Sequence, residues 1–191
     1  STGENPQRLD DYELASRLSF FLWGSLPDDE LLAAAAAGTL RDPATFAAQA
    51  DRLMNDRRMK RFCDSFAGQW LKIEHALASE PKKELFPDFY FAVRATNHMM
   101  IEPLLLFETV FVENRSILDF IHSDFTYRSD ALARFYRHEK QPLPLTKLMA
   151  TQEFHRVPVT SKREGGVITT GAVLTMTSNA TRTQPITRGA W

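Results

Sequence analysis

Several features that define common protein classes are scarce or missing in this sequence. Its 191 residues include one cysteine, Cys63, so the chain cannot form an intrachain disulfide. It also lacks a Cys-x-x-Cys-His haem-attachment motif and a cysteine zinc site. Cys63 follows Phe62 on an amphipathic helical pattern, which favours a small buried side chain over a nucleophile.

Charge of one sign and long apolar runs are also lacking. The formal net charge is −1 and no basic block occurs, which argues against a nucleic-acid or anionic-membrane partner. No apolar run is long enough to span a bilayer, so we predict no membrane span. No signal peptide is present, and the chain starts with Ser1 rather than Met. We therefore expect a processed or excised piece of a longer protein.

The common catalytic motifs are absent as well. We find no Gly-x-Ser-x-Gly elbow, no phosphate loop, no dinucleotide motif and no His-Glu-x-x-His. No two histidines have the i, i+4 spacing of a helical metal site, so we predict no metal and no cofactor bound within this chain. The histidines are His75, His98, His122, His138 and His155.

What is present is a globular composition with a strong helical pattern. Hydrophobic residues make up 43% and charged residues 25% of the chain. Apolar residues recur at helical spacing behind aspartates that can cap a helix, at Asp10 or Asp11, Asp42 and Asp56. Gly24 and Gly38 are natural helix ends. We predict a mainly α fold, an irregular or orthogonal helical bundle with a loop-rich C-terminal segment.

The stretch 88–112 is the predicted organising element. It reads as one long helix that is apolar on almost every side between Met99 and Val112, as expected inside a core. Pro103 predicts a kink or break near its middle. Around this helix we predict a lead-in over 1–8, a helical domain over 9–140, a linker over 141–156, and the start of a second Thr/Ser/Gly-rich domain or appendage over 157–191.

The C-terminal half contains less regular patterns. Residues 124–127 and 157–159 are typical of extended chain, and 146–155 permits one more short helix. The stretch 167–176 is rich in β-branched residues, yet its apolar spacing also permits a helix, so both alternatives stay open. Residues 177–185 have no periodicity and indicate a loop.

Three stretches resemble one group of proteins. They are LDDYELASRLSFFLW (9–23) with PDDELL (27–32), DFTY (124–127), and TSN (177–179) through RGAW (188–191). They resemble the large secreted proteins of planctomycetes and related bacteria, which join several domains of unknown function, often with a c-type cytochrome domain. This chain departs from their pattern at Glu102-Pro103, Arg128-Ser129-Asp130 and Glu164-Gly165-Gly166.

The resemblance implies a setting rather than a reaction. It implies a periplasmic, cell-envelope or extracellular location, and a longer parent whose neighbouring domains, a cytochrome c domain among them, are the partners. Any c-type haem would lie elsewhere in that parent. The first functional hypothesis is a non-catalytic helical module. The alternative is part of a periplasmic or extracellular enzyme, redox or polysaccharide-related, with its site at the interface to neighbouring domains.

The candidate catalytic residues lie on the central helix. Glu102 and Glu108 could perform acid–base chemistry or bind a cation, although buried carboxylates are more often paired for structural reasons. His98 beside Met99 and Met100 is compatible with haem ligation, but methionines more often fill a core. We expect Glu102 to be buried with a cationic or donor partner, Arg17 first, with Arg182 and Arg188 as alternatives.

The candidate binding residues form the densest polar group of the chain. Two arginines with nearby hydroxyls could bind a carboxylate, phosphate or sugar. The structural alternative is a loop in which the arginines satisfy backbone carbonyls or buried acids. These residues are Ser178, Thr181, Arg182, Thr183 and Arg188.

Overall fold

The computed structural model describes residues 8–87, 89, 95–138, 153–161 and 163–191. Over these residues the protein is mainly α-helical, as predicted, and contains one small two-stranded sheet. The chain divides into two compact units, Ser1–Ser65 and Phe66–Trp191. No helix in the described part of the chain has the length and apolar character needed to cross a membrane.

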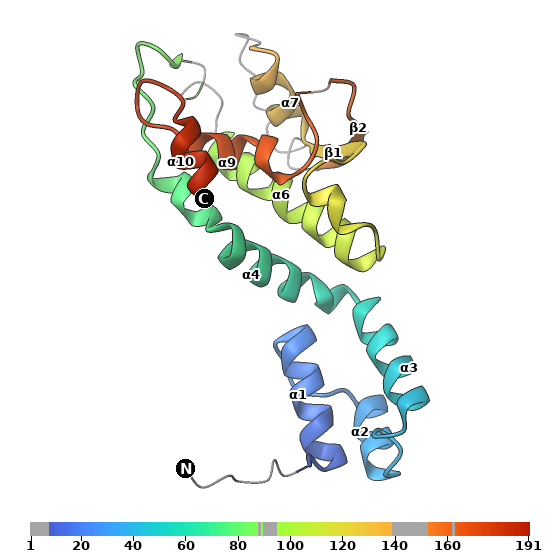
Figure 1. Cartoon of the computed structure of the whole chain (residues 1–191). Helices are drawn as coiled ribbons and strands as arrows, with labels where there is room; N and C mark the ends of the chain where they lie inside the picture. Colours follow the sequence, from blue (N-terminus) through green and yellow to red (C-terminus); the bar gives the residue numbers. More distant parts are fainter. Residues whose placement is uncertain (1–7, 88, 90–94, 139–152, 162) are drawn as a thin grey trace, which may run out of the picture. The chain divides into compact units, whose positions relative to one another are not determined.

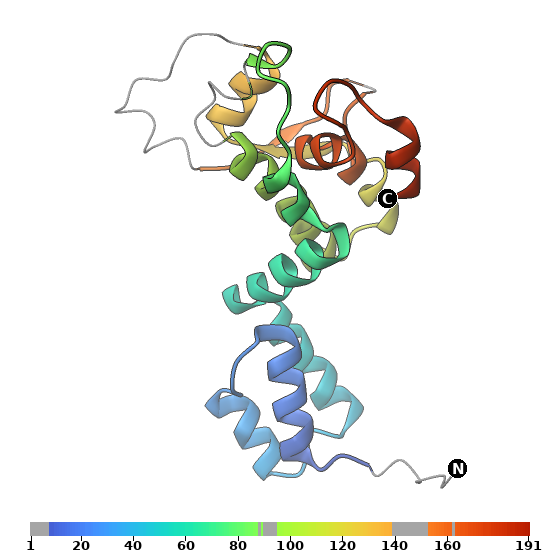
Figure 2. The ribbon, with the colours of Figure 1, turned by 90° about the vertical axis from the view of Figure 1, so that its left-hand side faces the viewer.

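The helical elements of the first unit begin at aspartates, three of them predicted (Asp10, Asp42 and Asp56) and one, Asp28, not predicted as a cap. Each aspartate accepts a hydrogen bond from a backbone N–H in the first turn, and Asp10 also forms a capping box with Glu13. Helix α1 ends at Gly24, whose φ of +60° suits glycine, and packs against both α2 and α3 (Figures 1 and 2). The elements are α1 (Asp11–Trp23), α2 (Asp29–Ala36), α3 (Pro43–Met54), the 3₁₀ turn η1 (Arg57–Met59) and the beginning of α4 (Lys60–Leu71).

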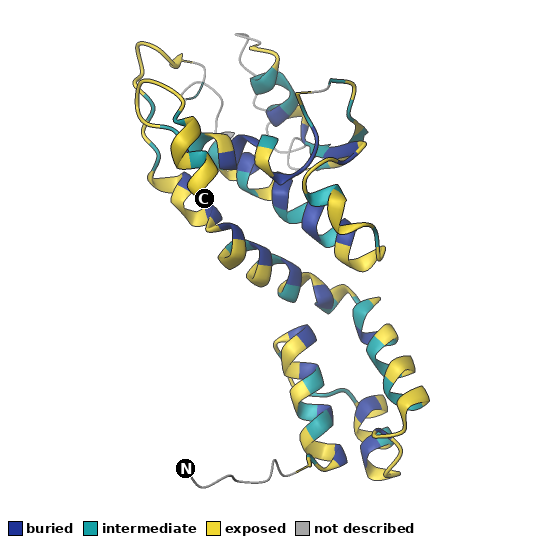
Figure 3. Ribbon diagram, in the orientation of Figure 1, coloured by how far each residue is buried: buried dark blue, intermediate teal, exposed yellow. Residues whose placement is uncertain are grey.

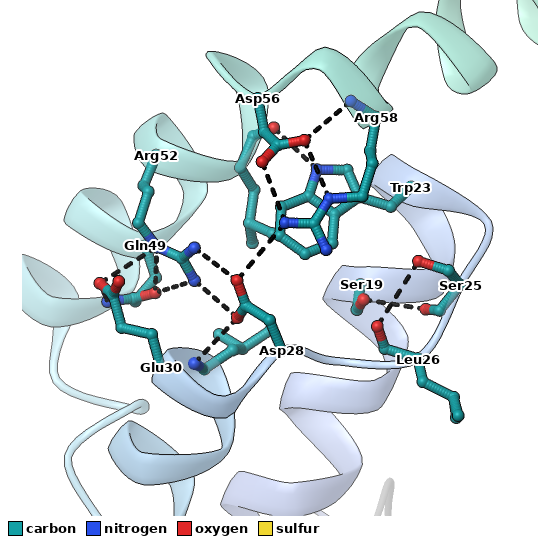
Figure 4. A network of polar contacts seen from close by, with 12 residues as sticks. Ser19, Trp23, Ser25, Leu26, Asp28, Glu30, Gln49, Arg52, Asp56 and Arg58 are labelled. Atoms are coloured by element: carbon teal, nitrogen blue, oxygen red, sulfur yellow. Dashed lines mark hydrogen bonds and ion pairs between the residues drawn. The ribbon is translucent and has the colours of Figure 1, made fainter.

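Trp23 lies at the centre of the first unit. Its side chain is fully buried, and its indole N–H donates to the carbonyl of Leu53 at 2.9 Å. The guanidinium of Arg58 lies over the ring, 3.3 Å from its centroid. Figure 4 shows how Asp56 and Asp28 hold the arginines in place: Arg58 donates to Asp56 and Arg52 donates to Asp28. The polar network thus covers the aromatic core of this unit.

Helix α6 (Ala95–Val112) organises the second unit, as the sequence predicted. Buried positions follow most of its length (Figure 3), and its most extensive contacts are with elements on several sides. These are the 3₁₀ turn η2 (Ile73–Ala78), the 3₁₀ turn η3 (Ile117–Phe120), strand β1 (Phe125–Arg128), helix α7 (Asp130–Tyr136) and helix α9 (Gly171–Met176). The core around α6 consists of Leu71, Ile73, Ala76, Met99, Leu106, Val110, Phe125, Leu132, Val167 and Ala172.

Of the kink or break predicted at Pro103, the break is wrong. Helix α6 continues through this residue, which is fully buried. A proline removes one backbone donor, but close packing on all sides keeps the helix in place. The earlier part of the predicted helix, residues 88 and 90–94, lies outside the described residues.

The two predicted extended segments pair with each other. Strand β1 and strand β2 (His155–Pro158) are antiparallel, with Phe125 opposite Pro158 and Arg128 opposite His155. The short helix expected over 146–155 falls largely outside the described residues, and its last residue, His155, lies in β2.

The C-terminal segment is helical where the sequence left helix and strand open. Val167–Thr169 forms the 3₁₀ turn η5, followed by α9 and by α10 (Pro185–Ala190). Val167 and Ala172 belong to the same core as α6. The compact units therefore divide between Ser65 and Phe66, while the linker expected over 141–156 lies mostly outside the described residues.

The acidic network of the first unit generates a pH prediction. Hydrogen bonds from the side chain and backbone of Arg58 lower the pKa of Asp56 from 3.8 to about 2. A lowered carboxyl pKa stabilises the fold above pH 3.8, and this stabilisation disappears as the pH falls through about 2. Asp56→Asn keeps an N-cap acceptor but loses the ion pair with Arg58, so the free energy of unfolding should fall by about 0.5 kcal/mol at pH 7. The substitution should also reduce the loss of stability at acid pH. Melting temperatures and the indole N–H resonance of Trp23, both followed against pH, measure this loss.

Asp51→Asn is the matched control, because Asp51 is exposed. Its acid profile should follow that of the wild-type protein. An Asp56→Asn profile with the wild-type acid slope would contradict the assignment to Asp56.

Candidate functional site

The centre of the candidate site is the carboxylate of Glu102 on α6. Its residue is only 3% exposed. One carboxylate oxygen accepts a hydrogen bond from the hydroxyl of Thr126 on β1 at 2.8 Å, and the other accepts from the hydroxyl of Tyr136 on α7 at 2.6 Å. Glu102 therefore joins three elements of the second unit through one charged group.

Tyr136 extends this connection to α9. The backbone N–H of Gly171 donates to the Tyr136 hydroxyl oxygen at 2.9 Å. The guanidinium of Arg128 lies 5.0 Å from the centroid of the Tyr136 ring and donates to Glu164 at 2.8 Å. A cation thus lies close to the carboxylate without donating to it.

Burial dominates the ionisation of this pair. It raises the pKa of the Glu102 carboxyl, and the hydrogen bonds from Tyr136 and Thr126 oppose the rise only in part. Burial, followed by the charge of Glu102, raises the pKa of Tyr136 well above its usual value. The Tyr136 hydroxyl therefore remains a protonated donor at neutral pH.

Glu102 has donor partners, as predicted, but they are not the predicted arginines. The sequence predicted a cationic or donor partner, and the donors are the neutral hydroxyls of Thr126 and Tyr136. Neither Arg17 nor the alternatives Arg182 and Arg188 fill this role. Arg17 is exposed on α1, and Arg188 donates instead to the hydroxyl of Thr177 at 3.1 Å. Hydroxyl donors satisfy a buried carboxylate without burying a second charge.

Of the other two catalytic candidates, His98 lies one turn before Glu102 on α6. His98 is buried, with its Nδ1 2.5 Å from the Ser129 hydroxyl and its ring 5.5 Å from that of Phe154. Ser129 also caps α7 by accepting from the backbone N–H of Leu132. This arrangement positions α7 on α6. Glu108 is half-buried further along α6.

A pocket of about 630 Å³ opens beside Tyr136. It lies between η2 with its following loop, the end of α7, and α9 with its following loop. Its floor includes Met99, Tyr136 and Gly171. The other apolar residues of its wall are Ala78, Pro81, Leu85, Phe86, Pro87, Phe89, Phe135, Leu174, Met176 and Ala180. Its other polar residues are His75, Ser79, Glu80, His138, Thr175, Ser178, Asn179, Arg182 and Thr183.

Three of the five predicted binding residues lie on this pocket. Ser178, Arg182 and Thr183 belong to its lining, and Ser178 and Thr183 face each other in an isolated β-bridge. Thr181 and Arg188 do not line it. The Thr181 backbone and hydroxyl donate to Asn179, which shapes the loop. Part of the predicted polar group therefore lines the pocket, and the rest does not.

Sequence reasoning missed the residues that connect Glu102 to the pocket. Tyr136 was not singled out by the sequence, and Thr126 lay in a segment predicted to be extended. Gly171 gave no local signal. The available signal was the buried carboxylate itself, which required donors, but the sequence did not indicate which hydroxyls would reach it.

The described residues hold no cluster of three or more histidine, cysteine, aspartate or glutamate side chains suited to a metal ion. The pocket does include His75 and His138, both exposed. The mainly apolar wall of the pocket suits an organic ligand.

The fold and the pocket define a mainly helical module with a concave site. Residues 9–137 match the model of the PSD4 family, described as a protein of unknown function (DUF1592). This match covers more than half of the chain, and the chain belongs to that family. It confirms the part of the resemblance that concerned a domain of unknown function. Neither the curated proteins nor the solved structures that were searched contain a match.

The geometry predicts distinct effects for two substitutions at Glu102. Glu102→Ala should lose about 3 kcal/mol, because it leaves a cavity and deprives the hydroxyls of Thr126 and Tyr136 of their acceptor. Glu102→Gln should lose less, since it keeps the shape and can still hydrogen-bond. Chemical denaturation measures both. The exposed Glu74→Ala is the control, and equal losses for Glu74→Ala and Glu102→Ala would contradict a structural role.

The raised pKa of Glu102 sets the sign of a second effect. The folded protein holds the Glu102 proton more tightly than the unfolded chain does, so ionisation of Glu102 disfavours folding. Relative to Glu102→Gln, the wild-type protein should be most stable at acid pH and should lose stability as the pH rises above 4.5. The difference in Tm between the two proteins, followed from acid to neutral pH, tests this sign. A difference that grows in favour of the wild type with rising pH would refute it.

Gly171 provides a steric prediction. A Cβ at this position would press against the Tyr136 hydroxyl oxygen and lie 2.9 Å from Cγ of Met99. Gly171→Ala should therefore destabilise the protein by about 2 kcal/mol. Gly189→Ala is the control, because a Cβ there meets nothing within 4 Å and alanine favours the helix. Equal melting temperatures for the two variants would contradict the close fit at Gly171.

Proposed function

We propose that this chain is a non-catalytic helical module that binds a small molecule in the pocket of its second unit. The pocket itself is the observation that carries the proposal. A concave site of about 630 Å³ with a mainly apolar wall and a few polar groups is typical of small-molecule binding. The match to a family of unknown function is compatible with such a role.

The use of the candidate catalytic groups supports binding over catalysis. The Glu102 carboxylate is occupied by two hydroxyl donors, and His98 is buried against Ser129. Neither residue lines the pocket in the described part of the chain. A general base must reach the proton that it abstracts from a substrate, and these two groups face the core instead.

We place this module in a secreted multidomain parent located in the periplasm, the cell envelope or outside the cell. Neighbouring domains are the proposed partners, including a cytochrome c domain that would carry the haem. The resemblance of 9–32, 124–127 and 177–191 to planctomycete-type proteins supports this setting. Cell fractionation with an antibody against this chain tests it, and recovery in the cytoplasmic fraction would refute it.

The second candidate function is part of an enzyme completed by neighbouring domains. It is favoured by the polar residues of the pocket lining, which include His75, His138 and Arg182. Assays of the parent protein for polysaccharide cleavage and dye reduction distinguish the two functions. Turnover that His75→Ala or His138→Ala abolishes in a folded protein would support the enzyme.

The binding proposal predicts uptake of a neutral apolar probe. N-phenyl-1-naphthylamine should show enhanced, blue-shifted fluorescence with the wild-type chain. Leu174→Asp should weaken this binding about tenfold, because it puts a charge into the apolar wall.

Ile186→Asp is the matched control. Ile186 is 90% exposed and lies outside the pocket lining, so its substitution should leave probe binding unchanged. Circular dichroism checks that both variants fold. Probe binding that is absent from the wild type, or equal in both variants, would overturn the proposal.

A further inference from the structure

Two opposite charges on the rim of the pocket point to the chemistry of its ligand. Glu80 and Arg182 are both exposed, and both belong to the pocket lining. Within the part of the chain that the structure describes, neither side chain makes a hydrogen bond or an ion pair. By contrast, Arg128 of the second unit forms an ion pair with Glu164.

The backbone brings these two charges to the same part of the rim. The N–H of Lys82 donates to the carbonyl of Ala180 at 2.6 Å, which joins the loop after η2 to the loop after α9. Glu80 and Arg182 each lie two residues from this bond. They nevertheless stay too far apart to form an ion pair with each other. Each charge is therefore available to a ligand group of opposite sign.

The wall of the pocket that carries these charges is mainly apolar. Phe86, Phe135, Leu174 and Met176 contribute to it. A ligand that matches this arrangement has a bulky apolar body and carries a cation and an anion at separate points. A single amino acid carries both charges on one carbon atom, whereas a dipeptide places a peptide unit between them, with Cα atoms about 3.8 Å apart.

We propose that the pocket binds a dipeptide of apolar residues, with its carboxylate at Arg182 and its ammonium group at Glu80. This proposal rests on the proposed binding function and names its ligand class. The guanidinium can bind both oxygens of a carboxylate. The apolar side chains of the dipeptide would lie against the aromatic and aliphatic wall.

Isothermal titration of the full chain with three matched probes tests the proposal. The probes are phenylalanyl-phenylalanine, its N-acetyl derivative without the ammonium group, and its C-terminal amide without the carboxylate. The wild-type protein should bind the free dipeptide about fivefold more tightly than either derivative, as expected for partly exposed ion pairs. Arg182→Gln should remove the preference over the amide. Glu80→Gln should remove the preference over the acetylated form.

Glu74→Gln and Arg163→Gln are the matched controls, because both residues are exposed and lie outside the pocket lining. They should leave all three affinities unchanged. Equal affinity of the wild type for the three probes, or a preference that survives both rim substitutions, would overturn the dipeptide assignment. If N-phenyl-1-naphthylamine still binds in that case, the binding function stands without this ligand. If neither probe type binds, both proposals fall.

Discussion

The buried carboxylate of Glu102 imposes the main constraint on the second unit. A charge inside a core is destabilising unless donors surround it, and here Thr126 and Tyr136 supply them. These donors come from β1 and α7, and Gly171 connects Tyr136 to α9. The requirements of one side chain on α6 therefore fix the positions of three further elements. Burial raises the pKa of the Glu102 carboxyl in spite of these two donors.

Close backbone approaches complete the same arrangement. Gly165 and Gly166 have φ of +108° and +79°, and a Cβ at either position would collide with the backbone of Ser123 or Ile121. These glycines bring η5 against the turn that precedes β1. Val167 then enters the core directly, followed by α9. Glycine is thus required on both sides of η5, first for the turn and then, at Gly171, for contact with Tyr136.

Local signals explain how much of this could be predicted. Aspartate caps and Gly24 set the helix ends of the first unit, because these effects act within one turn. The burial of Glu102 followed from its methionine and leucine neighbours. Its donors did not, since Thr126 and Tyr136 lie 24 and 34 residues away and nothing local selects them. Arg182 was found as part of a dense polar group, but its proximity to the loop that carries Glu80 becomes visible only once the two loops are joined. The predicted break at Pro103 does not occur, because a propensity argument omits the packing that holds α6 together.

Tyr136 belongs to both the core and the pocket. The part of the pocket lining near Tyr136 is therefore fixed by hydrogen bonds, whereas the rest of the lining includes exposed loops. The hydroxyl of Tyr136 is held by Glu102 and Gly171, while its ring forms part of the floor. Moving this ring would break hydrogen bonds to a buried charge, so the floor resists change. The opposite side consists of exposed loops joined by the backbone bond between Lys82 and Ala180. The pocket therefore combines a hydrogen-bonded floor with an exposed, charged rim. Such a division favours selection by the shape of the apolar body, with the charges of Glu80 and Arg182 refining the choice among ligands that already fit.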